Sequence, residues 1–245
     1  MFFLSIIFFS YRWYGWGTLS VLSLFLIYQT NTKYRPTLSL FIFFSIGLVL
    51  FVIGSDYFIS LELSKETKVL LNRCLLLCMI IGVCISLTLS KQKINFFTSM
   101  PNWRGRIAFP HHTLPTRTFF LFGLLGSFTI FLPLFFKEDV VIENNFLMFA
   151  LLFSLINALL EELLWRGVLL SSLKENISTP YAVVTTSIGF GLLHLSIGIP
   201  FVMSLLFSLG GLFYAFVVLK TNSIYPAIVF HFVINMGMVL NEWII

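Results

Sequence analysis

The chain has 245 residues, of which 58% are hydrophobic and only 10% are charged. A mean hydropathy of +0.98 exceeds what the core of a soluble protein needs, and it predicts an integral membrane protein built from helices. A net charge of +5 in such a chain indicates orientation in the membrane and contact with anionic membrane lipids, and not a nucleic-acid partner.

Apolar runs separated by charged or proline-containing breaks predict an all-α fold, a polytopic transmembrane helical bundle of about eight spans. The predicted spans cover residues 5–28, 38–58, 69–89, 118–136, 146–171, 180–198, 200–219 and 225–244. In the first of them, Arg12 and the aromatic residues around it are typical of a membrane-interface belt. That run is therefore either one span or a shorter span preceded by a surface segment.

The basic residues predict which way the spans run. With the N-terminus outside, the inner loops hold nine of them: Lys33, Arg35, Lys91, Lys93, Arg104, Arg106, Arg117, Lys174 and Lys220. The outer side then holds Lys65, Lys68, Arg73 and Lys137, together with the acidic residues Glu138, Asp139 and Glu143. This distribution agrees with the positive-inside rule. The longest loop, residues 91–118, mixes bases with aromatic residues and is predicted to lie in the headgroup region, with His111 and His112 solvated.

Two adjacent glutamates interrupt the apolar run that extends over residues 146–173. Each carboxylate near the middle of a spanning helix costs roughly 2.5–3.5 kcal/mol on insertion scales, so Glu161 and Glu162 require an explanation. Arg166 follows Glu162 by one helical turn and can neutralise it, which gives this pair a supporting role. Glu161 has no partner of opposite charge in its own helix, so we expect an unpaired acid that serves as a catalytic base or as an ion ligand.

Three further polar residues occur at positions where a span should be apolar: His194, His231 and Asn235. At 1.5 Å per residue, Glu161 and His194 lie roughly 16 and 22 Å from the break at residues 172–179. His231 and Asn235 lie roughly 10 and 16 Å beyond the turn near Ser223. We therefore expect the four groups to meet in the inner half of the bilayer. Interhelical hydrogen bonding could account for any one of them alone, but the desolvation cost of all four favours a function.

The chemistry that this set suggests is hydrolysis of an acyl or peptide bond. Glu161 in a low-dielectric cavity can take a proton from water, with His194 beside it, while His231 and Asn235 can donate hydrogen bonds to an oxyanion. A zinc ion held by Glu161, His194 and His231 is the alternative. No G-x-S-x-G or H-E-x-x-H motif occurs, which excludes a conventional serine hydrolase or zincin.

Three sequence strings resemble the motifs of a known family. EELLWRG (161–167), FGLLH (190–194) and HFVIN (231–235) are similar to the motifs E-E-x-x-x-R, F-x-x-x-H and H-x-x-x-N of the CPBP family. These are the CAAX-protease and bacteriocin-processing (Abi) intramembrane proteases, which include the type II CAAX prenyl endopeptidases. The resemblance covers roughly residues 154–238 and gives two regions: N-terminal transmembrane helices with a basic interfacial loop (1–145) and a catalytic CAAX-protease-like domain (146–245).

The resemblance implies a membrane endopeptidase whose site opens to the cytosolic side. Glu161 would activate the water with His194 as its partner, His231 and Asn235 would form the oxyanion side, and Glu162 and Arg166 would support them. No metal is needed in this mechanism. The substrate would be a peptide or a lipidated protein, and the location the bacterial plasma membrane. The alternatives are a non-catalytic scaffold or bacteriocin immunity protein and, in third place, an ion-coupled transporter.

Overall fold

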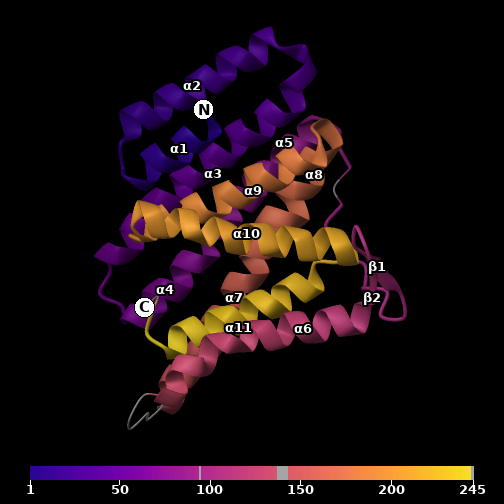
Figure 1. Ribbon diagram of the computed structural model, residues 1–245. Coiled ribbons are helices and arrows are strands. Elements are labelled where there is room, and N and C mark those ends of the chain that lie inside the picture. Colours follow the sequence, from indigo (N-terminus) through magenta and orange to yellow (C-terminus); the bar gives the residue numbers. More distant parts are fainter. Residues whose placement is uncertain (94, 137–142, 244–245) are drawn as a thin grey trace.

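The computed structural model describes residues 1–93, 95–136 and 143–243, and it confirms an all-α transmembrane bundle (Figure 1). Six helices are long and apolar enough to cross a membrane: Thr32–Ser60, Lys65–Leu89, Thr116–Leu134, Asn144–Asn176, Thr179–Ile197 and Phe201–Thr221. The protein is therefore an integral membrane protein. The predicted last span is the shorter helix α11 (Tyr225–Leu240), whose 16 residues reach about 24 Å. The predicted outer residues Lys137, Glu138 and Asp139, and position 244, lie outside the described residues.

The predicted first span, 5–28, is wrong as a single helix. The chain forms α1 (Phe2–Ser10), turns at Tyr11–Trp13, and returns as α2 (Tyr14–Thr30) packed against α1. Arg12 makes the turn with a φ of 61° and binds Asp56 of α3 (Arg35–Ser60) at 2.6 Å. With nine residues, α1 reaches only about 14 Å, which is too short to cross a bilayer.

This hairpin places the N-terminus at the same end of the bundle as the first basic loop. Met1 and Lys33 line one surface pocket together with Ile177. The predicted opposite placement of the N-terminus and the Lys33 loop is therefore wrong. The end of the bundle that holds these residues and the nine predicted inner-loop bases is called the basic end below.

The helices that follow alternate in direction between the two ends. α4 (Lys65–Cys74) and α5 (Leu76–Leu89) together return to the basic end, and α6 (Thr116–Phe128) with the 3-10 helix η2 (Thr129–Phe136) leaves it. α7 (Asn144–Glu162), the π-helical segment η3 (Leu163–Leu170) and α8 (Ser171–Asn176) form one long helix back to the basic end. α9 (Thr179–Leu193), with the short 3-10 helix η4 (His194–Ile197), α10 (Phe201–Thr221) and α11 complete the bundle. Figure 1 shows the C-terminus at the end opposite β1 and β2.

The loop of residues 91–118 contains a small element that the sequence did not predict. Strands β1 (Arg106–Ala108) and β2 (Thr113–Pro115) pair antiparallel, and the exposed His111 and His112 lie between them, as predicted for solvated residues. The loop docks on the bundle, because Lys220 donates to the carbonyl of Ala108 at 2.6 Å and Ile224 N–H donates to the carbonyl of Phe97 at 2.8 Å. These contacts hold the loop at the basic end.

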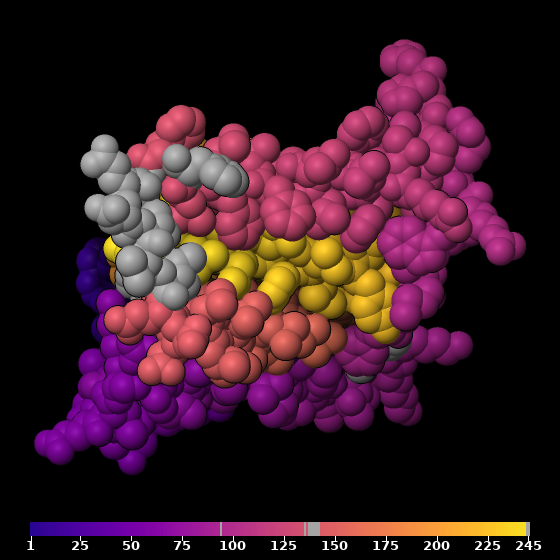
Figure 2. Space-filling view, turned by 90° about the horizontal axis from the view of Figure 1, so that it is seen from below, coloured from indigo at the N-terminus to yellow at the C-terminus, as the bar shows by residue number. Residues whose placement is uncertain are grey.

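Small residues bring α9 and α10 close together where they support the site. A Cβ atom at Gly211 would lie 2.8 Å from the Cα of Ser187, so only glycine allows this approach. Seen from below, α11 runs between α6 and α7 (Figure 2). The C-terminal helices thus surround the middle of the long helix α7–η3.

Candidate active site

The two glutamates lie where the long helix changes its hydrogen-bonding pattern. Glu161 and Glu162 are the last residues of α7, and the π-helical segment η3 begins directly after them. π-Helical turns are rare and frequently occur at functional sites. Both carboxylates are buried, with 2% and 0% of their residue surfaces exposed. Two buried carboxylates at one point require positive charge or hydrogen-bond donors around them.

Arg166 supplies the first of these charges, as predicted. Its Nη1 lies 2.8 Å from Oε1 of Glu162, and its Nη2 donates to the carbonyl of Gly211 at 2.9 Å. The rings of Phe190 and Tyr214 lie 4.7 and 5.2 Å from the guanidinium carbon, which places the cation over two aromatic faces. Arg166 therefore links η3 to α9 and α10 as well as neutralising Glu162.

His231 connects the two glutamates. Its Nδ1 lies 2.9 Å from Oε1 of Glu162, and its Nε2 lies 3.6 Å from Oε2 of Glu161. The ring of Tyr214 stacks on the imidazole at a centroid distance of 4.6 Å. Tyr214 is a site residue that sequence reasoning missed, because a tyrosine in an apolar helix gives no signal of its own.

Glu161 is not unpaired. Nη1 of Arg73, on α4, lies 3.7 Å from its Oε1. Arg73 donates to Oδ1 of Asn157 at 3.2 Å and to Oδ1 of Asn72 at 2.6 Å, and Asn72 donates in turn to Ser55 at 2.7 Å. The predicted lack of a counter-charge was wrong because the partner comes from another helix.

The predicted position of Arg73 in an outer loop was wrong for the same reason. Arg73 is 7% exposed and faces the centre of the bundle. A signal existed in the sequence, since Arg73 stands inside the apolar run of residues 69–89, where an ionisable residue indicates a functional site. Asn157 accepts a hydrogen bond from Nη1 of Arg73 and so holds the guanidinium beside Glu161.

His194 lies at the end of its helix. Its Nδ1 lies 2.9 Å from the carbonyl oxygen of Phe190, and since a carbonyl only accepts, Nδ1 carries the proton in this bond. In the neutral ring, Nε2 keeps its lone pair. The ring stacks on Phe207 at 4.4 Å, which fixes its plane. His194 begins η4, directly before the α9–α10 turn at Gly198, and the 15 residues of α9 separate it from the break before Thr179.

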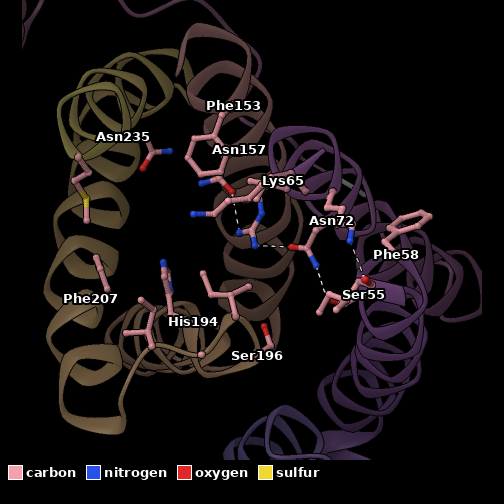
Figure 3. Close-up of a pocket in the computed structure, with 18 of the residues that line it drawn as sticks. Ser55, Phe58, Lys65, Asn72, Phe153, Asn157, His194, Ser196, Phe207 and Asn235 are labelled. Atoms are coloured by element: carbon pink, nitrogen blue, oxygen red, sulfur yellow. Dashed lines mark hydrogen bonds between the residues drawn. The ribbon is translucent and has the colours of Figure 1, made fainter. Parts of the chain in front are cut away.

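Two cavities are lined by residues of the site. The larger, of about 480 Å³, is lined by His194, Asn235, Arg73 and Asn157, among others. Figure 3 shows His194, Asn157 and Asn235 around this space, from η4, α7 and α11. A separate cavity of about 10 Å³, measured for the centre of a water molecule, is lined by both Glu161 and His194. That volume is about what one water molecule requires.

Asn235 has a free donor at the wall of the larger cavity. It is 5% exposed, and its Nδ2 is buried without a hydrogen-bond partner among the described residues. A buried amide donor of this kind costs free energy unless a ligand satisfies it. The structure therefore brings Glu161, Glu162, Arg166 and His231 into direct contact, and it brings His194 and Asn235 to the adjoining cavities.

The donor set was tested against the predicted zinc alternative. Within the described part of the chain, no group of three or more His, Cys, Asp or Glu side chains is placed to hold a metal ion. Nε2 of His231 lies 3.6 Å from Oε2 of Glu161, but Nη1 of Arg73 lies 3.7 Å from the other carboxylate oxygen, Oε1. A cation there would face a guanidinium at short range, so this arrangement does not fit zinc.

The comparison with family models agrees with this site. Residues 143–237 match the model described as Type II CAAX prenyl endopeptidase Rce1-like. This part of the chain is similar to the Rce1-like endopeptidases. It includes all six predicted site residues and Tyr214, whereas Arg73 lies outside it. The Rce1-like match implies a protease, hence a hydrolase. No curated protein and no solved structure matches the chain.

Proposed function

We propose that the protein is an intramembrane endopeptidase that hydrolyses a peptide bond with a water molecule activated by Glu161 and His194. The observation that supports this most directly is the cavity of about 10 Å³ lined by both residues. It has room for one water molecule, next to a carboxylate and an imidazole that can share its protons. We place the protein in the plasma membrane of a bacterium.

The reaction follows from the groups around that water. Glu161 accepts one proton while the water oxygen attacks the carbonyl carbon of the peptide. Nε2 of His194 accepts a hydrogen bond from the other hydrogen and orients the lone pair. The proton held by Glu161 then passes to the leaving amine, the C–N bond breaks, and a carboxylic acid and an amine are released.

The developing oxyanion needs donors on the far side of the water. Asn235 offers its unpartnered Nδ2 at the wall of the larger cavity. His231 bonds Glu162 through Nδ1, and a second proton on its Nε2, which lies 3.6 Å from Glu161, would let it donate a hydrogen bond to the oxyanion, while the proton taken from the water goes to the leaving amine. Arg166 and Glu162 keep His231 in place through the bond to its Nδ1.

The larger cavity is the proposed substrate site. Among the described residues that line it, the charged ones are Arg12, Lys65, Lys68 and Arg73, and none is acidic. The remaining lining is largely apolar, with Phe58, Phe153 and Phe207 among its members. Such a site favours a peptide, or a lipidated protein, that carries acidic groups beside an apolar segment.

Hydrolysis of quenched fluorogenic peptides by the purified protein in detergent tests the proposal. Glu161→Ala and Glu161→Gln are expected to lose measurable turnover while still inserting and eluting as folded protein. The matched control is Glu175→Gln, an exposed carboxylate on α8, which should keep wild-type rates. Activity of Glu161→Ala within a few-fold of wild type would refute the assignment. No turnover by the wild-type protein on any peptide would favour a non-catalytic membrane role.

A further inference from the structure

The mouth of the larger cavity lies at one particular end of the bundle. Its rim includes Lys65 and Lys68 at the start of α4, and Gly198 and Ile199 in the turn between α9 and α10. Arg12, in the α1–α2 turn, lines it as well. All of these segments lie opposite the basic end, at the end called the pocket end below.

The site is closed toward the basic end. Most residues of η3, which follows the glutamates in that direction, are buried, with Leu164, Trp165, Val168 and Leu169 at 0% exposure. The next turn is also packed, since Leu173 is 1% exposed. A substrate therefore reaches the glutamates through the pocket end.

The basic residues are distributed very unequally between the two ends. The chain has 15 lysines and arginines, and the nine predicted for inner loops all lie at the basic end. Contacts fix two of them there: Lys220 binds the carbonyl of Ala108, and Lys174 lies over the ring of Phe97 at 5.0 Å. Arg73 and Arg166 are buried inside the bundle and do not count for orientation.

At the pocket end the described part of the chain has only Arg12, Lys65 and Lys68. Arg12 is paired with Asp56 at 2.6 Å and still counts as a base, so three bases at this end stand against nine at the basic end. Lys137 would add one more base but lies outside the described residues. The amino terminus adds a positive charge at the basic end, because α1 and α2 form a hairpin.

We propose that the catalytic cavity opens on the extracytoplasmic side of the membrane and receives peptide segments presented there. The basic end is cytoplasmic by the positive-inside rule, which counts lysines and arginines in short loops close to the spans. The pocket end then faces outward, which is opposite to the cytosolic opening that the family resemblance implies. This inference rests on the proposed function for the reaction itself, but the side of access follows from the charges and the cavity alone. The substrates are thus exported or membrane-anchored chains with the scissile bond near the outer surface.

Cysteine labelling tests the orientation without any need for activity. Leu63→Cys places a thiol in the exposed α3–α4 turn at the pocket end, and His111→Cys places one in the β1–β2 turn at the basic end. Intact cells of the expression host are treated with a membrane-impermeant maleimide, before and after permeabilisation. The unaltered chain, with its own Cys74, Cys78 and Cys84, gives the background.

We expect Leu63→Cys to be labelled in intact cells and His111→Cys only after permeabilisation. The reverse pattern, or equal labelling of both, would overturn the proposal. The purified variants are then assayed for peptide hydrolysis in detergent, where orientation has no effect. Loss of all hydrolysis with outward labelling of Leu63→Cys would refute the reaction and leave the orientation standing. Peptide hydrolysis by a variant whose Leu63→Cys thiol is labelled only after permeabilisation would refute the orientation and leave the reaction standing.

Discussion

Arg73 lies 3.7 Å from Glu161 and brings a positive charge from α4 into the centre of the C-terminal half of the bundle. The two buried glutamates thus face two buried arginines, one from their own helix and one from a distant helix. Removing one partner of a buried charge pair leaves the other without compensation, which is strongly unfavourable. Arg73 therefore supplies the counter-charge that the buried carboxylate of Glu161 needs beside the water site.

Arg73→Met is expected to lower peptide hydrolysis about ten- to a hundredfold, because it leaves the buried carboxylate of Glu161 without its counter-charge and free to move away from the water site. The measurement is kcat and KM for a fluorogenic peptide.

Arg73→Lys is the matched control, since it keeps the positive charge and loses only the planar set of N–H donors of the guanidinium. It should restore most of kcat. A merely structural role for Arg73 would lower thermal stability in both variants but leave kcat of the folded protein unchanged. That outcome would contradict the positioning role.

Arg73 also marks the limit of what the sequence reveals about this site. Pairs within one helix, such as Glu162 and Arg166, follow from the helical repeat and were predicted correctly. A pair between α4 and α7 depends on how the helices pack, and no helical spacing encodes it. The stacking of Tyr214 on His231 was missed for the same reason.

The fold was predictable to a similar degree. The apolar runs located the long helices, because length and hydropathy alone decide whether a segment can span a bilayer. The hairpin of α1 and α2 was not located, since both arms are apolar and only the turn at Arg12 separates them. That one error also reversed the predicted side of the N-terminus. The roles of the predicted catalytic residues remain predictions.

Arg166→Ala is expected to destabilise the protein by about 3–5 kcal/mol, because it leaves Glu162 buried without its cation. It also removes the bond to the carbonyl of Gly211. The melting temperature in detergent is the measurement. Arg117→Ala, at an exposed position on α6, is the control and should change stability by less than about 0.5 kcal/mol.

Adding Glu162→Gln to Arg166→Ala should restore part of that loss, because the uncompensated charge is removed as well. His231 also bonds Glu162, so the recovery will be incomplete. Strictly additive effects in this double-mutant cycle would show that the two side chains are not coupled.

The bases at the cavity rim predict a preference for acidic peptides. Lys65→Gln combined with Lys68→Gln should raise KM for a peptide with acidic flanks by about three- to tenfold, because each exposed charge contributes a few tenths of a kcal/mol or more. The kcat value should stay near that of the wild type, since neither lysine reaches the glutamates. Added salt should weaken the wild-type preference and have less effect on the double variant.

Lys91→Gln, at the basic end, serves as the control for a change of net charge. It should leave KM unchanged for acidic and neutral peptides alike. An equal rise of KM for both kinds of peptide in the rim variant would argue against recognition of acidic groups.

Substitution of His231 distinguishes best between a zinc-dependent and a metal-free mechanism. A zinc ligand lost from a catalytic site removes metal and activity together, whereas a lost oxyanion donor costs about a hundred- to a thousandfold in rate. Because the guanidinium of Arg73 lies 3.7 Å from Glu161 and disfavours a metal cation there, we expect His231→Ala to lower the rate of hydrolysis only in part, as for a lost oxyanion donor. We also expect protein dialysed against a chelator to keep its activity. Stoichiometric zinc by elemental analysis, with activity lost on chelation and regained on adding zinc, would overturn this mechanism and leave the protease assignment intact.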